Sequence, residues 1–188
     1  MEQPAGNKIT GNPSSHPALS VKWVEDFPDI PLNRNEAYKL RVTSKGVEIE
    51  AITETGVYRA IQTLRQLTEK KGNGIAITGC EITDWPAFRI RGFMQDVGRT
   101  YISTDELKRE IAILARYKIN VFHWHLTENQ AWRLQSKVFP MLNDSVNTTR
   151  QPGKYYTLEE ARELAAFCKQ HHVLLIPDVP GGGIEPGV

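Results

Sequence analysis

The side chains best suited to chemistry lie in three places along the chain. Ten consecutive residues, 123–132, contain two histidines, a glutamate, two amides and two tryptophans. Arginine and carboxylate side chains pair with adjacent hydroxyl groups, and tryptophan rings cover the apolar face of a sugar. These residue types therefore predict a carbohydrate site. Its candidate residues are Asp96, Arg99, Glu128, Asn129, Gln130, Trp132 and Asp178.

Several candidates also have a purely structural explanation. His123 and His125 alternate along a predicted strand, so both rings lie on the same side of it, which would suit a metal ion. No Asp, Glu or Cys accompanies them at the spacing of a metal site, so packed or hydrogen-bonded histidines are favoured and no metal ligand is predicted. Asp96 and Arg99 could instead form a structural ion pair, and Glu128 could be a solvated loop carboxylate. The residues alone leave these two alternatives open.

The second half of the chain is expected to position these residues on a parallel sheet. Strands are predicted at 89–96, 119–126 and 172–179, because each is a largely apolar run. Capping boxes that begin at Ser103 and Thr157 open a helix between each pair of strands. The sheet is either a barrel or a doubly wound layer, and both build their sites at the carboxyl ends of the strands. A doubly wound binding domain would need a glycine-rich turn directly after the first strand. The chain reads MQDVGRT there, which does not supply such a turn.

The first half of the chain is expected to form a separate, small α+β domain. The hydrophobic pattern changes near residues 84–86, which places this domain at 36–87 and the next one at 88–188. Alternation on both sides of a Ser-Lys-Gly turn predicts a hairpin over 38–51. A helix is predicted from about 55 to 69, closed by Lys70, Lys71 and Gly72. Residues 1–35 are expected to be partly irregular, with one strand at 19–24.

Composition and charge exclude some classes of protein. The chain has 188 residues, a formal net charge of +1 and 40% hydrophobic residues, so nothing favours nucleic acid or an anionic membrane as a partner. No apolar run is long enough to span a bilayer, and the first ten residues lack the pattern of a signal peptide. Cys80 and Cys168 have no metal-ligand spacing and do not predict a disulfide framework.

Three stretches of the sequence resemble one enzyme family. They read EAYKLRVTSKGVEIEAITETGVYRAIQTLRQL, ITDWPAFRIRGFMQDVGR and KINVFHWHLTENQAWR. In this order they are similar to the small domain, the first barrel strand and the second barrel strand of family 20 glycoside hydrolases, the β-N-acetylhexosaminidases. The resemblance covers residues 36 to 180. It implies a (β/α)8 TIM barrel that removes terminal β-linked N-acetylglucosamine or N-acetylgalactosamine from a glycan, with no cofactor and no metal.

The resemblance also implies a mechanism and a division of roles. The carbonyl oxygen of the sugar's own acetamido group attacks the anomeric carbon, a glutamic acid protonates the leaving oxygen and an aspartate orients the acetamido group. Arg99 matches the arginine that holds the hydroxyls at carbons three and four, and Asp96 matches the carboxylate beside it. Glu128 and Asn129 stand where most members have two aspartates. We therefore expect Arg99 and Glu128 to bind substrate, with Asp96, His125, Asn129, Trp132 and Asp178 in support.

Two departures from the family pattern bear on activity. The third strand reads IPDVPGGG, so Pro177 and Asp178 match the family, but its second acid and its histidine have no counterpart. Residues 88–188 number about 100, whereas a complete barrel takes about 250. They suffice for three βα units, and the catalytic Asp-Glu pair belongs after a fourth strand. No catalytic residue is therefore expected in this chain.

The sequence thus yields two hypotheses of different classes. In the first, the chain is a truncated and inactive piece of an exo-acting hexosaminidase that carries part of the sugar site. In the second, it is a non-catalytic carbohydrate-binding or assembly module that associates with itself through the exposed edge of an incomplete barrel. The resemblance favours an exported protein, in the periplasm, at the cell surface or in lysosomes.

Overall fold

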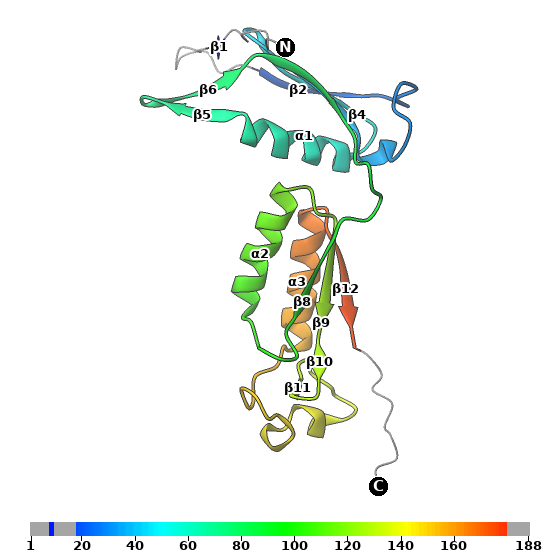
Figure 1. The fold of residues 1–188 in the computed structure, drawn as a ribbon, viewed down its shortest axis with the longest axis vertical. Helices are drawn as coiled ribbons and strands as arrows, with labels where there is room; N and C mark the ends of the chain where they lie inside the picture. Colours follow the sequence, from blue (N-terminus) through cyan, green and yellow to red (C-terminus); the bar gives the residue numbers. More distant parts are fainter. Residues whose placement is uncertain (1–7, 10–17, 180–188) are drawn as a thin grey trace, which may run out of the picture. The chain divides into compact units, whose positions relative to one another are not determined.

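The computed structural model describes residues 8–9 and 18–179 and divides the chain into two compact units, 1–89 and 90–188. Each unit has its own sheets and helices (Figure 1). The expected division fell at residue 88, within two residues of this boundary. No helix in the described part of the chain is long and apolar enough to cross a membrane.

The first unit is built on a four-stranded sheet. Its strands lie in the order β2 (Ala18–Trp23), β4 (Gly46–Ala51), β3 (Tyr38–Thr43) and β7 (Cys80–Asp84). The β3–β4 hairpin is confirmed, and its alternating pattern buries one face of each strand. Helix α1 (Glu54–Gln66) packs on that face, as Figure 1 shows, over a core of Tyr38, Leu40, Val42, Val47, Ile49, Ala51 and Ala60.

Strand β2 belongs to this sheet although it lies within the segment expected to be partly irregular. It pairs in parallel with β4, and Ala18 stands opposite Gly46. Gly46 has φ +151°, and a side chain on it would place a Cβ 2.5 Å from the carbonyl oxygen of Ala18. Only glycine allows the two strands to approach so closely. Residues 1–35 also contain the short strand β1 (Lys8–Ile9) and the start of the 3-10 helix η1 (Arg34–Glu36), residues 24–33 are irregular, and 1–7 and 10–17 lie outside the described residues.

The predicted end of the first helix is wrong. Helix α1 ends at Gln66, and the residues expected to close it form strand β5 (Thr68–Lys71). This strand turns at Gly72, with φ +58°, and pairs with β6 (Gly74–Thr78). The backbone hydrogen bonds of that hairpin replace those of another helical turn, and periodicity in the sequence did not reveal the exchange.

The second unit has three parallel strands in chain order, β8 (Gly92–Asp96), β9 (Val121–His125) and β12 (Leu174–Asp178). Helices α2 (Thr104–Arg116) and α3 (Leu158–Gln170) connect them and contact each other beside the sheet (Figure 1). Three neighbouring parallel strands in chain order occur both in a barrel wall and in one half of a doubly wound sheet, so these strands fit both alternatives.

Both predicted capping boxes are confirmed. The Ser103 hydroxyl accepts a hydrogen bond from the Glu106 amide, and the Glu106 carboxylate accepts one from the Ser103 amide. Thr157 and Glu160 repeat the pattern at the start of α3. These contacts fix where each helix begins. The residues between a strand and the helix that follows it therefore form a loop at the end of the sheet.

That loop is long between β9 and α3. It contains a small hairpin of β10 (Thr127–Glu128) and β11 (Ala131–Trp132), followed by the 3-10 helices η2 (Pro140–Asn143) and η3 (Ser145–Asn147). The hairpin begins immediately after the last residues of β9. It therefore holds Glu128 over the carboxyl ends of the parallel strands.

Candidate functional site

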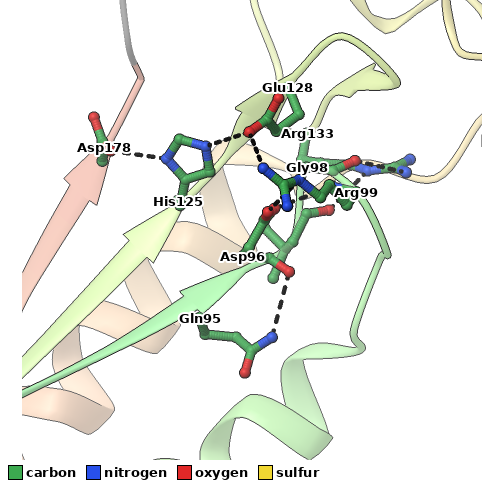
Figure 2. Close-up of polar contacts among 9 residues, drawn as sticks. Gln95, Asp96, Gly98, Arg99, His125, Glu128, Arg133 and Asp178 are labelled. Atoms are coloured by element: carbon green, nitrogen blue, oxygen red, sulfur yellow. Dashed lines mark hydrogen bonds and ion pairs between the residues drawn. The ribbon is translucent and has the colours of Figure 1, made fainter.

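The carboxyl ends of the three parallel strands bring the predicted residues together. Strand pairing sets Asp96 of β8 opposite His125 of β9, and His125 opposite Asp178 of β12. Each of these residues is the last of its strand. Figure 2 shows their side chains meeting with those of Arg99 and Glu128 above the strand ends. These side chains therefore converge at the edge of the sheet where the sequence predicted the site.

Arg99 occupies the centre of this group. Its Nε lies 3.1 Å from Asp96 Oδ2, its Nη2 donates to Glu128 Oε1 at 3.0 Å, and its backbone amide donates to Asp96 Oδ1 at 3.1 Å. The Arg99 side chain is nevertheless 64% exposed. The hydrogen bond to Glu128 raises the pKa of Arg99, and the same bond holds the pKa of Glu128 below its usual range. Both groups are therefore charged at neutral pH.

Gly98 allows the Arg99 loop to approach Glu128. A Cβ on Gly98 would lie 2.8 Å from the Glu128 amide nitrogen and 2.9 Å from both the Glu128 Cβ and the Thr127 carbonyl carbon. Two of these three atoms are backbone, so a larger residue would push β10 away. The absence of a side chain at Gly98 thus keeps Glu128 within reach of Arg99.

His125 joins Glu128 to the third strand. Its Nδ1 lies 2.8 Å from Asp178 Oδ2, and its Nε2 lies 3.5 Å from Glu128 Oε1 (Figure 2). An ionised carboxylate only accepts hydrogen bonds, so the His125 Nδ1 is the donor to Asp178. The bond to Asp178 raises the pKa of His125, and the bonds from His125 and then His123 lower the pKa of Asp178. Asp178, His125, Glu128 and Arg99 thus form a continuous polar chain.

The structure corrects one premise about the two histidines. Spacing in the sequence gave them no neighbouring carboxylate, yet His123 Nε2 lies 2.9 Å from Asp178 Oδ2, the same oxygen that His125 contacts. Asp178 follows these residues by more than fifty positions, so only the sheet brings them together. Two groups among the described residues could hold a metal ion: His123, His125 and Asp178, and a second group of Asp96, His125 and Glu128.

Asn129 and Trp132 lie at the rim of this group. Asn129 is exposed in the turn between β10 and β11. Trp132 is half-buried, and its indole N–H donates to the Leu134 carbonyl at 2.5 Å. The contacts described for the Arg99 and His125 side chains include neither residue. Their expected supporting role therefore depends on a ligand and not on contacts within the protein.

Sequence reasoning missed Arg133. This arginine is completely buried, and burial lowers its pKa. Its guanidinium donates to five backbone carbonyls, those of Val97, Gly98, Arg150, Gln151 and Lys154. Two of these carbonyls, those of Val97 and Gly98, belong to the loop that carries Arg99, and Figure 2 shows Gly98 beside Arg133. An arginine beside a tryptophan in a polar loop gives no sign of burial, so its partners could not be found from sequence.

Comparisons with known proteins match both units of the chain to one family. The model for the catalytic domain of glycosyl hydrolase family 20 matches residues 88–183, and the model for domain 2 of the same family matches residues 4–85. A beta-hexosaminidase of Porphyromonas gingivalis is 37% identical over 191 residues, which cover 95% of this chain and 23% of that protein.

Solved structures give the same result. A beta-N-acetylhexosaminidase from Bacteroides fragilis superposes with a TM-score of 0.76 at 31% identity, covering 86% of this chain and 33% of that one. An exo beta-N-acetylglucosaminidase from Vibrio harveyi, solved in complex with N-acetylglucosamine, gives a TM-score of 0.73 at 32% identity, with 86% and 26% covered. The chain thus spans about a quarter to a third of the length of the proteins it matches.

Proposed function

The chain belongs to glycosyl hydrolase family 20, and on that basis we propose that it carries the sugar-holding edge of an exo-acting β-N-acetylhexosaminidase. The three strands and two helices of the second unit are proposed to be the first βα units of a (β/α)8 barrel, with the first unit as the domain that precedes it. The substrate is a glycan that ends in β-linked N-acetylglucosamine or N-acetylgalactosamine. The relative from Vibrio harveyi, solved with N-acetylglucosamine, supports this class of sugar.

The geometry of Arg99 carries this proposal. Two carboxylates, Asp96 and Glu128, fix the guanidinium through Nε and Nη2 while most of the side chain stays exposed. A guanidinium has five N–H groups, so these two contacts leave donors for a ligand. Two adjacent sugar hydroxyls can accept hydrogen bonds from the N–H groups of one planar guanidinium. Because Arg99 is held before the sugar arrives, binding costs little side-chain entropy.

The other residues divide into contact and positioning roles. Glu128 accepts from Arg99 and is proposed to accept from a sugar hydroxyl with its remaining lone pairs. His125 and Asp178 keep Glu128 in place from the side of β12. Trp132 uses its indole N–H within its own loop, so its proposed contribution is the ring face, and Asn129 adds an exposed amide.

The proposed reaction is hydrolysis with retention of configuration, assisted by the substrate. The acetamido oxygen of the sugar attacks the anomeric carbon while an acid protonates the leaving oxygen. The carboxyl pair for these steps is expected after a fourth barrel strand, beyond the three strands described here. The proposed contribution of this chain is therefore to bind and orient the terminal sugar, and the 188 residues by themselves are proposed not to hydrolyse it.

The test measures binding and hydrolysis separately on the purified 188-residue chain. Titration with N-acetylglucosamine, followed by NMR, should shift the Arg99 Nε–H and Trp132 Nε1–H resonances. Arg99→Ala should weaken binding by about tenfold or more, because each hydrogen bond to a charged group contributes about 1.5–3 kcal/mol. Arg162→Ala, which removes an exposed arginine from α3, is the matched control. Equal affinity in the Arg99 variant would refute the assignment.

Hydrolysis tests the second half of the proposal. A chromogenic β-N-acetylglucosaminide should release no product when incubated with the 188-residue chain. Release that scales with protein and persists in independent preparations would show that the chain supplies its own acid. That result would contradict the assignment of catalysis to residues after a fourth strand, and it would leave the binding result untouched.

Self-association is a second candidate, favoured by one observation. Among the described residues β8 and β12 each pair only with β9, so each has an unpaired edge. These two strands also expose Phe93, Met94, Leu174 and Ile176. Edges and apolar side chains of this kind favour pairing between copies. Sedimentation velocity of the purified chain over a range of concentrations would detect it, and a constant monomeric coefficient would rule it out.

A further inference from the structure

Three side chains with metal-binding atoms converge at the ends of β9 and β12. Asp178 Oδ2 lies 2.9 Å from His123 Nε2 and 2.8 Å from His125 Nδ1. Two imidazole nitrogens therefore share one carboxylate oxygen, and all three ligand atoms lie within 4.8 Å of one another. The histidines are two residues apart on β9, which places both rings on the same side of the strand.

We propose that His123, His125 and Asp178 form a binding site for a divalent transition metal ion of the zinc type. Two imidazole nitrogens and one carboxylate oxygen are a donor set that zinc accepts, and three protein ligands leave a fourth position for water or another ligand. Nitrogen donors disfavour magnesium and calcium, which prefer oxygen ligands. This site shares His125 and Asp178 with the proposed sugar site, but neither the sugar nor Arg99 supplies a ligand to it, so zinc binding can be tested separately.

The spacing of the ligand atoms allows an ion to enter. Zinc bonds of about 2.0–2.2 Å at tetrahedral angles separate the ligand atoms by about 3.3–3.5 Å. The observed separations of 2.8 and 2.9 Å must therefore open by roughly half an ångström. The side chains of His123 and Asp178 are 39% and 33% exposed, so both can make this small movement without displacing a packed core.

Glu128 supplies an independent argument for the site. A histidine that binds a metal commonly donates its other ring N–H to a carboxylate, which fixes the ring and increases its basicity. With a metal on Nδ1, the Nε2 of His125 faces Glu128 Oε1 at 3.5 Å, and Glu128 is itself held by Arg99. The protonated ring has two N–H groups and can donate to both Asp178 and Glu128, whereas the neutral ring has one N–H and can donate to only one of them. A metal on Nδ1 satisfies both sides of the neutral ring.

The second possible group is a poorer site. It consists of Asp96, His125 and Glu128, and so it offers one nitrogen and two carboxylates. Both carboxylates already contact the guanidinium of Arg99. A cation there would have to compete with this charge, whereas the described contacts of the Asp178 carboxylate are with the two histidines.

The test titrates the metal-free 188-residue chain with zinc chloride by calorimetry and with cobalt chloride by visible absorption. We expect one equivalent of zinc per chain and cobalt bands typical of four-coordinate geometry. Affinity should fall at least about 100-fold in His123→Ala and in Asp178→Asn. It should fall about tenfold in Glu128→Gln, which removes the negative charge of the carboxylate beside His125 Nε2. His171→Ala, at the end of α3, removes a histidine elsewhere and should bind zinc as the unaltered chain does.

Two results would overturn the proposal. One is the lack of saturable zinc binding by the unaltered chain. The other is undiminished binding in both His123→Ala and Asp178→Asn, which would place the ion elsewhere. If a variant fails to fold, judged by circular dichroism, the unaltered chain still decides the question. Its His123 and His125 ring resonances must shift on zinc addition, and unchanged resonances contradict the site.

Discussion

Replacing Arg133 with methionine should destabilise the second unit more than any other single arginine change in it. The buried guanidinium ties two segments, residues 97–98 and 150–154, to its own loop through their backbone carbonyls. Its three shortest bonds are to Lys154 at 2.7 Å, Arg150 at 2.8 Å and Val97 at 3.0 Å, and those to Gly98 and Gln151 are 3.3 Å long. Methionine has similar length and no donor, so it fills the space and leaves these carbonyls unpaired.

The magnitude follows from the number of bonds and the exposure of their acceptors. Each short bond from a charged donor contributes about 1.5 kcal/mol at the low end of the usual range, which gives about 4–5 kcal/mol for three. Arg150 and Lys154 are exposed residues, so water can replace part of what their carbonyls lose. The expected loss in the free energy of unfolding is therefore about 3 kcal/mol. Lysine at the same position keeps a charge and three donors, and should lose about half as much.

The assay is urea unfolding followed by tryptophan fluorescence. Trp23 and Trp85 are first changed to phenylalanine, so that Trp124 and Trp132 report on the second unit alone. With a slope of about 1.5 kcal/mol per molar urea, the midpoint should fall by roughly 2 M in Arg133→Met. Arg162→Met, on the exposed face of α3, is the control. A midpoint within about 0.3 M of that control would refute the assignment of Arg133 as the residue that holds these loops.

Two further predictions concern the neighbours of Arg99. Gly98→Ala should displace β10 and destabilise the unit by about 1–3 kcal/mol. It should also break the hydrogen bond from Arg99 Nη2 to Glu128, seen as a change in the Arg99 Nη–H resonances. Gly92→Ala, whose Cβ would have 3.8 Å to its nearest neighbour, should change neither quantity. The His125 ring should titrate by NMR above its ordinary pKa of 6.5 and return toward it in Asp178→Asn. Because the pKa of His125 is raised in the folded state, this contact contributes its full stability below pH 6.5 and loses it as the pH rises through the folded-state pKa. A His125 pKa that is unchanged by Asp178→Asn would contradict this assignment.

The sequence determined the local elements. The Ser103 and Thr157 capping boxes, the β3–β4 hairpin and the three apolar strands all depend on residues within a few positions of one another. Backbone geometry converts such spacings directly into a helix start or a buried face. The prediction that polar residues meet at the carboxyl ends of the strands also needed only the order of strands and helices, because parallel strands end at one edge.

Tertiary structure decided which of those residues touch. Asp178 lies between His123 and His125 because β12 pairs with β9 in a register set by the packing of the whole sheet. Arg133 is buried because two segments, residues 97–98 and 150–154, present their carbonyls to it. Residues 68–71 form a strand and do not extend the helix, because β6 provides partners for their backbone hydrogen bonds. The first two outcomes depend on groups far apart in the chain, and the third depends on a hairpin partner that helical periodicity does not reveal.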